Sequence, residues 1–210
     1  MKHIPLVLVI GLALSLCNLS NRLKSANSNA PGGTTNRSGD AGGVVAEHAE
    51  PTAAQTAALS GGQEIKWDQQ GMSWSLPPKW TQATKESKML VWRSPGSSEA
   101  ASLIVNISTM DEKFPTDVSI KAFYDGAKTR AKNGEVDEVK WLEIDGVKGV
   151  EFREANPEKP DDSRRLQWMA YRKYAGQVQL VNLMLATSGK DFPRHQDAMY
   201  GILYSTKLIH

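Results

Sequence analysis

Beyond about residue 62, the spacing of apolar and polar positions predicts several strands, then a helix, two hairpins and a second helix. Short apolar runs, closed by turn-forming residues such as Gly71, are typical of strands. These runs lie at residues 64–68, 72–76, 88–93 and 102–109. The first half of this region is therefore predicted to form a sheet.

A helix is predicted to begin near Thr116. Thr116 is placed to cap the free backbone amides of the first turn, and Asp117 favours the positive end of the helix dipole. Asn133-Gly134 suits the C-terminal end of this helix. Five apolar residues recur at helical spacing: Val118, Ala122, Phe123, Ala127 and Ala131.

A tight hairpin is predicted next. Residues 138–144 and 147–154 flank Asp145-Gly146, a dipeptide that tolerates positive φ and suits a type I′ turn. The two flanking segments are therefore expected to pair as antiparallel strands.

A second predicted hairpin joins residues 165–173 to residues 177–187, and its strands are apolar on both faces. Such strands must be covered on both sides, which favours a central antiparallel sheet between helical layers. One cover is a helix expected from Asp191 as cap, with Pro193 in its first turn. Its apolar side carries Phe192, His195, Met199, Ile202 and Leu203. The predicted fold class is α/β, in the α+β sense, arranged as an α/β/α sandwich.

The first 17 residues have the pattern of a signal peptide. Lys2 and His3 give a short cationic start, and residues 4–16 form an apolar stretch. A membrane-spanning helix needs about 20 apolar residues, so this stretch is short for a span. Export is therefore the leading interpretation.

The only cysteine, Cys17, stands where this apolar stretch ends. The junction Leu14-Ser15-Leu16-Cys17 resembles the bacterial lipobox, whose cysteine carries diacylglycerol and becomes the mature N-terminus. Leu14 and Ser15 fit that pattern, whereas Leu16 departs from it, because a small residue normally precedes the cysteine. We predict lipidation at Cys17. Cleavage after Ser15 by the general signal peptidase and an uncleaved signal anchor stay open as alternatives.

Residues 18–62 are dominated by Gly, Ser, Thr, Ala and Asn, and they contain no aromatic residue. Such a segment buries too little surface to fold, so it is predicted to be a disordered linker. A transient helix within residues 44–59 is the alternative for its last part. The expected organisation is a signal peptide at 1–17, a linker at 18–62 and a folded domain at 63–210.

The charge balance argues against a nucleic-acid partner. Of 25 basic residues, four lie in the first 62 positions, and three of the 23 acidic residues lie there too. The predicted domain is therefore nearly neutral and lacks the basic excess of nucleic-acid-binding proteins.

Residues 71–80, with the sequence GMSWSLPPKW, resemble the opening of PsbP-like domains, in which a strand is followed by proline and then tryptophan. Residues 204–208 resemble the terminal signature of the same family, and the intervening elements occur in the matching order. The resemblance implies an α/β/α sandwich with roles mostly in binding and assembly, and it supplies no catalytic residues. Relatives include an extrinsic photosystem II subunit, a Ran-binding nuclear family and bacterial lipoproteins of the DcrB type. The lipobox-like start is similar to that lipoprotein branch.

Candidate catalytic groups are few. His195 is the one histidine inside the predicted fold, and a catalytic histidine also needs an orienting carboxylate and a nucleophile. The loop at 155–163 carries Glu158, Asp161 and Asp162, with basic residues around them. A solvated hairpin tip is the simplest interpretation, and a weak cation or partner-contact site on these carboxylates is the alternative. Metal ligands are not assigned.

The six tryptophans all lie beyond residue 62, and five fall in predicted strands: Trp67, Trp74, Trp92, Trp141 and Trp168. Most are expected to be structural, although flat aromatic faces also suit sugar or peptide binding.

The sequence therefore predicts a non-enzymatic binding or assembly module of the cell envelope, exported and tethered through a lipid or signal anchor. Its expected location is extracytoplasmic, in the periplasm or at the cell surface, with an unidentified protein or envelope component as partner. We expect no cofactor and no catalytic residue. Two alternatives are a small extracytoplasmic hydrolase or metal-assisted enzyme, and an extrinsic subunit of the photosystem II type.

Overall fold

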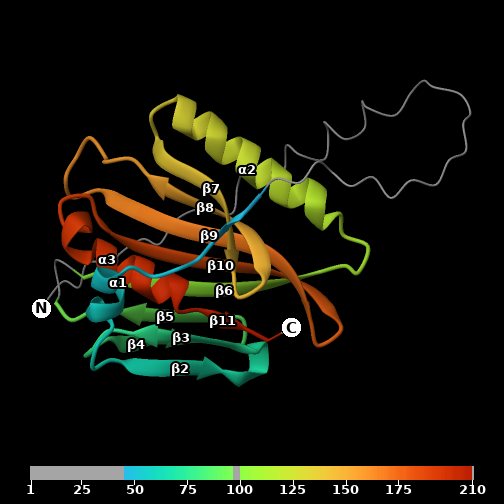
Figure 1. Cartoon of the computed structure of the whole chain (residues 1–210), viewed down its shortest axis with the longest axis horizontal. Coiled ribbons are helices and arrows are strands. Elements are labelled where there is room, and N and C mark those ends of the chain that lie inside the picture. The colour runs from blue at the N-terminus through green and yellow to red at the C-terminus, as the bar shows by residue number, and fades with distance from the viewer. Residues whose placement is uncertain (1–44, 97–99, 210) are drawn as a thin grey trace, which may run out of the picture. The chain divides into compact units, whose positions relative to one another are not determined.

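The largest element of the structure, a computed structural model that describes residues 45–96 and 100–209, is an eight-stranded sheet (Figure 1). All described residues belong to the unit that spans residues 43–210. The strand order is β1-β7-β8-β9-β10-β6-β5-β4. The bounds are Glu47–His48 (β1), Thr81–Lys85 (β4), Met89–Arg93 (β5), Ser102–Met110 (β6), Val136–Ile144 (β7), Val147–Glu154 (β8), Ser163–Tyr174 (β9) and Gln177–Ser188 (β10). Every neighbouring pair is antiparallel except β1 with β7.

A second sheet of three strands has the order β11-β3-β2. Its strands are Gln63–Trp67 (β2), Met72–Leu76 (β3) and Lys207–Leu208 (β11), and the short 3-10 helix Asp68–Gln70 joins the first two. Three α-helices complete the fold: Ala53–Ala58 (α1), Thr116–Lys132 (α2) and Phe192–Tyr204 (α3).

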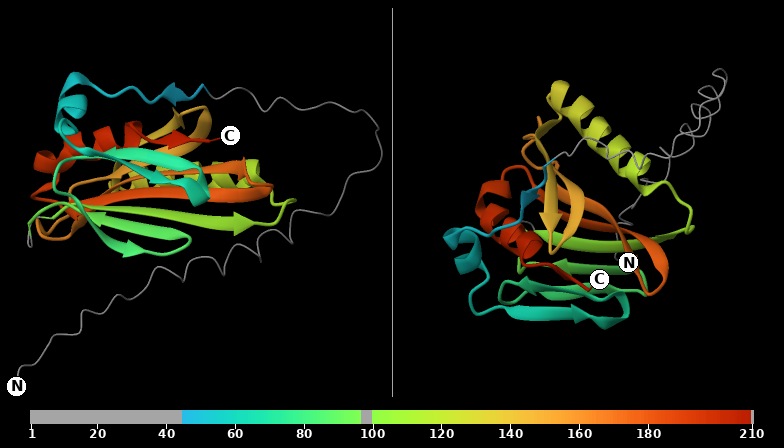
Figure 2. Two further views of the ribbon diagram at one scale, coloured as in Figure 1. Left: turned by 90° about the horizontal axis from the view of Figure 1, so that it is seen from below. Right: turned by 45° about the vertical axis from the view of Figure 1, so that its right-hand side comes forward.

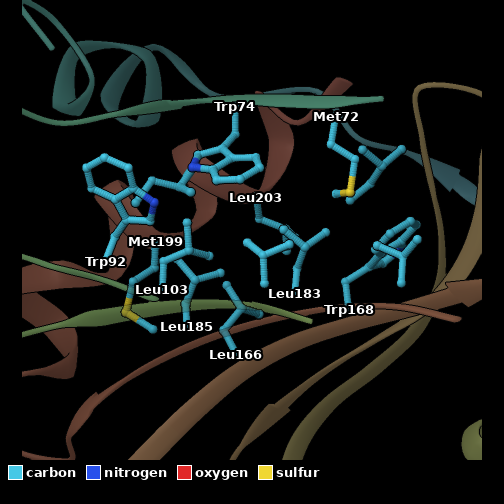
Figure 3. Packing of buried hydrophobic residues seen from close by; sticks show 14 of the residues in the cluster. Met72, Trp74, Trp92, Leu103, Leu166, Trp168, Leu183, Leu185, Met199 and Leu203 are labelled. Atoms are coloured by element: carbon cyan, nitrogen blue, oxygen red, sulfur yellow. The ribbon is translucent and has the colours of Figure 1, made fainter. Parts of the chain in front are cut away.

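One face of the large sheet, here the inner face, is covered by the small sheet together with α3 (Figure 2). Trp74 of β3 points from the small sheet toward Leu183 and Leu185 of β10, and Trp168 of β9 fills the same layer (Figure 3). These four side chains are at most 1% exposed. The main core therefore lies between two sheets and one helix.

The opposite, outer face is covered in part by α2, which packs on β7, β8 and β9 (Figure 1). A smaller apolar cluster lies under this helix, built from Ala127, Val136, Phe152 and Met169. Amphipathic α2 thus supplies the second helical cover that the sequence predicted. The mixed α+β fold, with a large antiparallel sheet flanked by few helices, is confirmed. A small sheet shares the inner layer with α3.

Both predicted hairpins have two-residue turns with positive φ. Asp145 and Gly146 have φ of 47° and 80°, and Ala175 and Gly176 have φ of 49° and 75°. Paired positive φ values characterise the type I′ turn, whose twist matches that of the flanking strands. The chemistry of Asp145-Gly146 therefore determines the register of β7 against β8.

Some local details differ from the expectations. β4 was not predicted, because its five residues TQATK are polar and four of them are exposed. The side chain of Thr116 does not cap α2, whose flanking residue is Pro115. Asp191 precedes α3 as expected, although its side chain makes no capping hydrogen bond.

The structure also differs from the expected linker at 18–62. Glu47 and His48 pair with β7, the amide of Ala49 donates to the carbonyl of Glu143 at 2.9 Å, and α1 packs on α3. Sequence pattern missed β1 because it is two residues long. Helix α1 lies within residues 44–59, where a transient helix was the alternative; the linker was preferred there, and α1 buries no residue of its own. The predicted signal peptide, Cys17 and the linker up to residue 44 lie outside the described residues.

Candidate functional site

A network of charged and tyrosine side chains lies between β7, β8 and α3, on the inner face of the large sheet. We call it the Lys140–Glu151 network, and it consists of Glu138, Lys140, Glu151, Arg153, Tyr200 and Tyr204. The antiparallel register places Lys140 opposite Glu151 and Glu138 opposite Arg153. The last two turns of α3 supply the tyrosines.

Glu151 is the most unusual group of this network, because its side chain is 0% exposed. Tyr204 donates a hydrogen bond to Oε2 of Glu151 at 3.2 Å, and Nζ of Lys140 lies 3.5 Å from Oε1. Burial raises the pKa of Glu151 to about 7. It outweighs the charge of Lys140, which lowers the pKa, and the like charge of Glu138 adds a smaller upward shift. Oε1 has no hydrogen-bond partner among the described residues. A carboxyl group of this kind titrates near neutral pH.

Lys140 connects this carboxyl group to the N-terminal strand. Its ammonium group lies 3.2 Å from Glu138 and 3.3 Å from Glu47 of β1. Burial alone would lower the pKa of Lys140, but the charges of Glu151 and Glu138 and the phenol of Tyr204 raise it above its usual value. Lys140 therefore stays charged and holds acidic groups from three strands.

Arg153 organises the other end of the network. Its guanidinium contacts Glu138 at 3.0 Å and Asp137 at 2.7 Å, and it donates to the hydroxyl of Tyr200 at 3.1 Å. That hydroxyl in turn donates to Glu138 at 3.0 Å. Burial raises the pKa of Tyr200, as do the nearby carboxylates, so the phenol remains a neutral donor.

A second ionic cluster surrounds Glu154 at the end of β8. Arg165 forms a two-pronged contact with this carboxylate, and Arg130 of α2 donates to it at 2.9 Å. Burial would raise the pKa of Glu154, but the hydrogen bonds from the two arginines outweigh burial and lower it. Glu154, Arg165 and Arg153 flank the loop expected to be a solvated tip, so part of that charge cluster is an interior ion network.

The remaining carboxylates of the loop lie outside that network. Asp161 pairs with Lys190 at 2.6 Å, and its side chain is 80% exposed. In residues 45–96 and 100–209, no group of three or more His, Cys, Asp and Glu side chains has the geometry of a metal site. The alternative of a cation site on Glu158, Asp161 and Asp162 therefore gains no geometric support from these residues.

His195 lies half-buried in the first turns of α3. The structure does not bring it into the Lys140–Glu151 network, whose α3 members are Tyr200 and Tyr204. His195 lines neither of the two clefts described next. The hydrolase alternative required a polar pocket that joins His195 to two carboxylates, and these clefts do not provide it.

Two shallow clefts open beside the small sheet. One of about 580 Å³ lies between the free edges of β2 and β4, with Trp67 and Trp92 in its lining and Lys66 and Lys85 among its charged residues. The other, of about 450 Å³, lies between α1, α3 and β2. Neither contains a member of the Lys140–Glu151 network.

Five tryptophans are at most 9% exposed: Trp67, Trp74, Trp80, Trp92 and Trp168. The sixth, Trp141, is half-buried and stacks on Tyr124 of α2 with ring centroids 4.9 Å apart. Most tryptophans are therefore structural, as expected.

Neither a protein-family model nor a curated protein sequence matches this chain. Solved structures do match. LpqN of Mycobacterium tuberculosis, described as involved in cell envelope biogenesis, aligns with a TM-score of 0.54 and 11% identity, over 71% of this chain and 91% of LpqN. This likeness shows a shared fold.

Two further structures align less closely. The cyanobacterial PsbP of Synechocystis has a TM-score of 0.45 and 14% identity, over 70% of this chain and 92% of its own. The Ran-binding protein Mog1p of Saccharomyces cerevisiae has a TM-score of 0.43 and 11% identity, over 70% and 95%. Membership in the DcrB-type lipoprotein branch stays a prediction.

Sequence pattern did not single out the Lys140–Glu151 network. A signal was nevertheless present, because the turn at Asp145-Gly146 fixes the cross-strand partners of β7 and β8. Counting outward from that turn pairs Lys140 with Glu151. Nothing in the sequence shows that α3 would cover this pair.

Of the helices in the described part of the chain, none has the length and apolarity to cross a bilayer.

Proposed function

We propose that this chain is an exported, membrane-tethered module of the cell envelope that binds a protein or envelope component and performs no catalysis. The observation that carries the proposal is the order of its parts: a signal-like leader, Cys17 where that leader ends, a polar segment and then one folded unit. A lipid on Cys17 would hold the folded unit near the membrane while leaving it free to search for a partner.

Two further observations support this role. LpqN, which has the same fold, is described as involved in cell envelope biogenesis. In addition, the buried carboxyl groups of Glu151 and Glu154 contact Lys140 and Arg165 beneath α3 and α2, and neither residue lines either cleft. Removing one partner of such a buried contact would leave the other charge uncompensated, so the fold itself requires these groups. Fold alone does not choose a function, so the tether is tested first.

The test is the mass of the mature N-terminal peptide from the membrane fraction, for wild type and for Cys17→Ala. We expect wild type to begin at a Cys17 that carries diacylglycerol, and Cys17→Ala to lose both the modification and the membrane association. Leu16→Gly is the matched variant, because a small residue before the cysteine should speed processing. An unmodified N-terminus beyond Cys17, or an intact Met1 leader, would contradict the lipid tether.

The binding role has its own readout. Crosslinking in intact cells, with wild type and Cys17→Ala compared at equal expression, should give a defined protein or envelope adduct that weakens when the tether is lost. Adducts that are equally abundant in both chains would show that the tether does not serve binding.

A further inference from the structure

The outer face of the large sheet has a cover on one half only. Helix α2 packs on β7, β8 and β9, and its apolar cluster extends as far as Leu180 on β10. Helices α1 and α3 lie on the inner side (Figure 2). Within the described residues, β5 and β6 therefore carry no covering helix on their outer side.

This half of the face is apolar at its centre. Val91 of β5, Ile104 of β6 and Met184 of β10 occupy directly neighbouring register positions, and Met89 lies next to Val91 on the same face. We call these four residues the outer stripe. All four are half-buried, and none belongs to either core cluster. Methionine adapts its shape to a partner, which suits a binding surface.

The strands that carry and flank the outer stripe supply only basic charges to this face. Strands β4, β5, β6, β9 and β10 contain no aspartate or glutamate. Arg93 stands at one end of the outer face and Lys173 at the opposite corner, both exposed and neither in an ion pair with a described residue. Acidic residues border this face in two places. Glu86 follows β4, and its amide donates to the carbonyl of Met89 at 2.8 Å. Asp111 and Glu112 follow β6 in the loop at the Lys173 end. An acidic partner would therefore complement this face most strongly at its Arg93 end, which lies away from Glu86 and Glu112.

The dimensions suit a helix. Four strands from β10 to β4 span about 15–20 Å, which leaves room for one helix of about 10 Å diameter beside α2. Across the sheet, Arg93 is in register with Ala186 of β10, and Lys173 is in register with Val178. These two β10 positions are eight residues apart, which is about 27 Å along a strand. A helix of about 18 residues has that length. The same face already binds one amphipathic helix, α2, through apolar residues.

We propose that the outer stripe binds an acidic amphipathic helix of a partner protein, which lies beside α2 and completes the second layer of the sandwich. Its apolar side would contact Met89, Val91, Ile104 and Met184, and its carboxylates would meet Arg93 and Lys173. The proposal rests on the binding role proposed above, and it does not depend on Cys17.

The first test uses the full chain and a synthetic peptide of about 18 residues that places leucines on one helical face and glutamates elsewhere. We expect binding that weakens with salt and falls about fivefold or more in Arg93→Glu with Lys173→Glu. The control is Lys128→Glu on the exposed side of α2, which should leave binding unchanged. A matched peptide with lysine in place of glutamate should not bind. Equal binding of both peptides, no binding of the acidic peptide, or an equal effect of Lys128→Glu would overturn the proposal.

The second test identifies the occupant in cells, through a photo-crosslinking amino acid at Ile104 and, as control, at Lys128. We expect an adduct from position 104 alone, whose crosslinked peptide is an acidic amphipathic helix. The proposed acidic helix would be contradicted by an adduct with lipid, by an adduct with a second copy of this chain, or by the absence of any adduct from position 104. The peptide test is done in solution and does not depend on membrane attachment. If Cys17 carries no lipid but the acidic peptide still binds, the lipid tether is wrong and the outer-stripe site stands. Circular dichroism of each variant shows whether it folds.

Discussion

Tyr204, in the last turn of α3, donates a hydrogen bond to the fully buried carboxyl group of Glu151 at a distance of 3.2 Å. The contact joins the C-terminal helix to the middle of β8, two elements that lie about fifty residues apart in the chain. Because Lys140 also reaches Glu47, the same network extends to the N-terminal strand β1.

Glu151 should make the stability of the protein depend on pH near neutrality. Its pKa in the folded state is raised from 4.5 to about 7, so the folded state binds a proton more tightly than the unfolded state. This stabilisation is complete below about pH 4.5 and is lost as the pH rises through about 7. Above pH 7, Glu151→Gln should raise the free energy of unfolding by up to roughly 3 kcal/mol.

Urea unfolding of wild type and Glu151→Gln between about pH 5 and about pH 8 measures this effect, because the difference between the two chains removes other titrating groups. The difference should grow with pH. A constant difference, or a variant destabilised most at high pH, would show that the ion pair with Lys140 keeps Glu151 charged at lower pH.

Glu154 should behave in the opposite way. Its pKa is lowered, because hydrogen bonds from Arg165 and Arg130 outweigh the effect of burial. Its contribution to stability is therefore present above its unfolded pKa and is lost as the pH falls through its folded pKa. At neutral pH, Glu154→Gln should lower the free energy of unfolding by about 2–4 kcal/mol, because Arg165 loses its acidic partner and Arg130 keeps only Glu135.

The control for Glu154 is Asp161→Asn, which breaks an exposed pair with Lys190 and should cost at most about 0.5 kcal/mol. Thermal unfolding at neutral pH and below about pH 4 distinguishes the two sites. If Glu154→Gln had the same effect at both pH values, the arginine contacts would not be the source of the stabilisation.

Two buried tryptophans should respond differently to replacement by phenylalanine. The indole N–H of Trp168 donates to the carbonyl of Leu142 at 3.1 Å, whereas that of Trp74 is buried without a partner among the described residues. Trp168→Phe removes a buried hydrogen bond, while Trp74→Phe removes an unsatisfied donor. Trp168→Phe should therefore cost about 1–3 kcal/mol more. Denaturant unfolding of the two variants tests this, and equal costs would mean that cavity formation alone decides both.

The predictable parts of the fold are those whose local pattern agrees with their tertiary role. Residues 147–154 pair as expected because Asp145-Gly146 specifies both turn and register. β4 escaped prediction because it is a polar edge strand, and β1 because a two-residue strand has no period to detect. The burial of Glu151 depends on where α3 packs. The position of α3 is set by its contacts with β3, β9 and β10, which a local sequence pattern does not reveal. Cys17, in contrast, is a purely sequence-based candidate.

The folded boundary near residue 45, rather than 62, can be tested through two glycines in helices. An added Cβ at Gly201 of α3 would lie 2.7 Å from the carbonyl oxygen of Gln55 in α1, whereas at Gly126 of α2 it would meet no atom within 4 Å. Gly126→Ala should stabilise the protein by about 1 kcal/mol, because alanine favours the helix. Gly201→Ala gains the same propensity but must push α1 away from α3.

Hydrogen exchange of residues 45–62 reads out this displacement. In wild type and Gly126→Ala, the amide of Ala49 should be protected through its bond to Glu143, and the amides at the end of α1 should be protected too. Gly201→Ala should speed exchange across α1 while leaving β9 and β10 unchanged, because their ladder does not involve this segment. Fast exchange throughout residues 45–62 in wild type would instead support the linker predicted at residues 18–62, with the folded domain starting near residue 63.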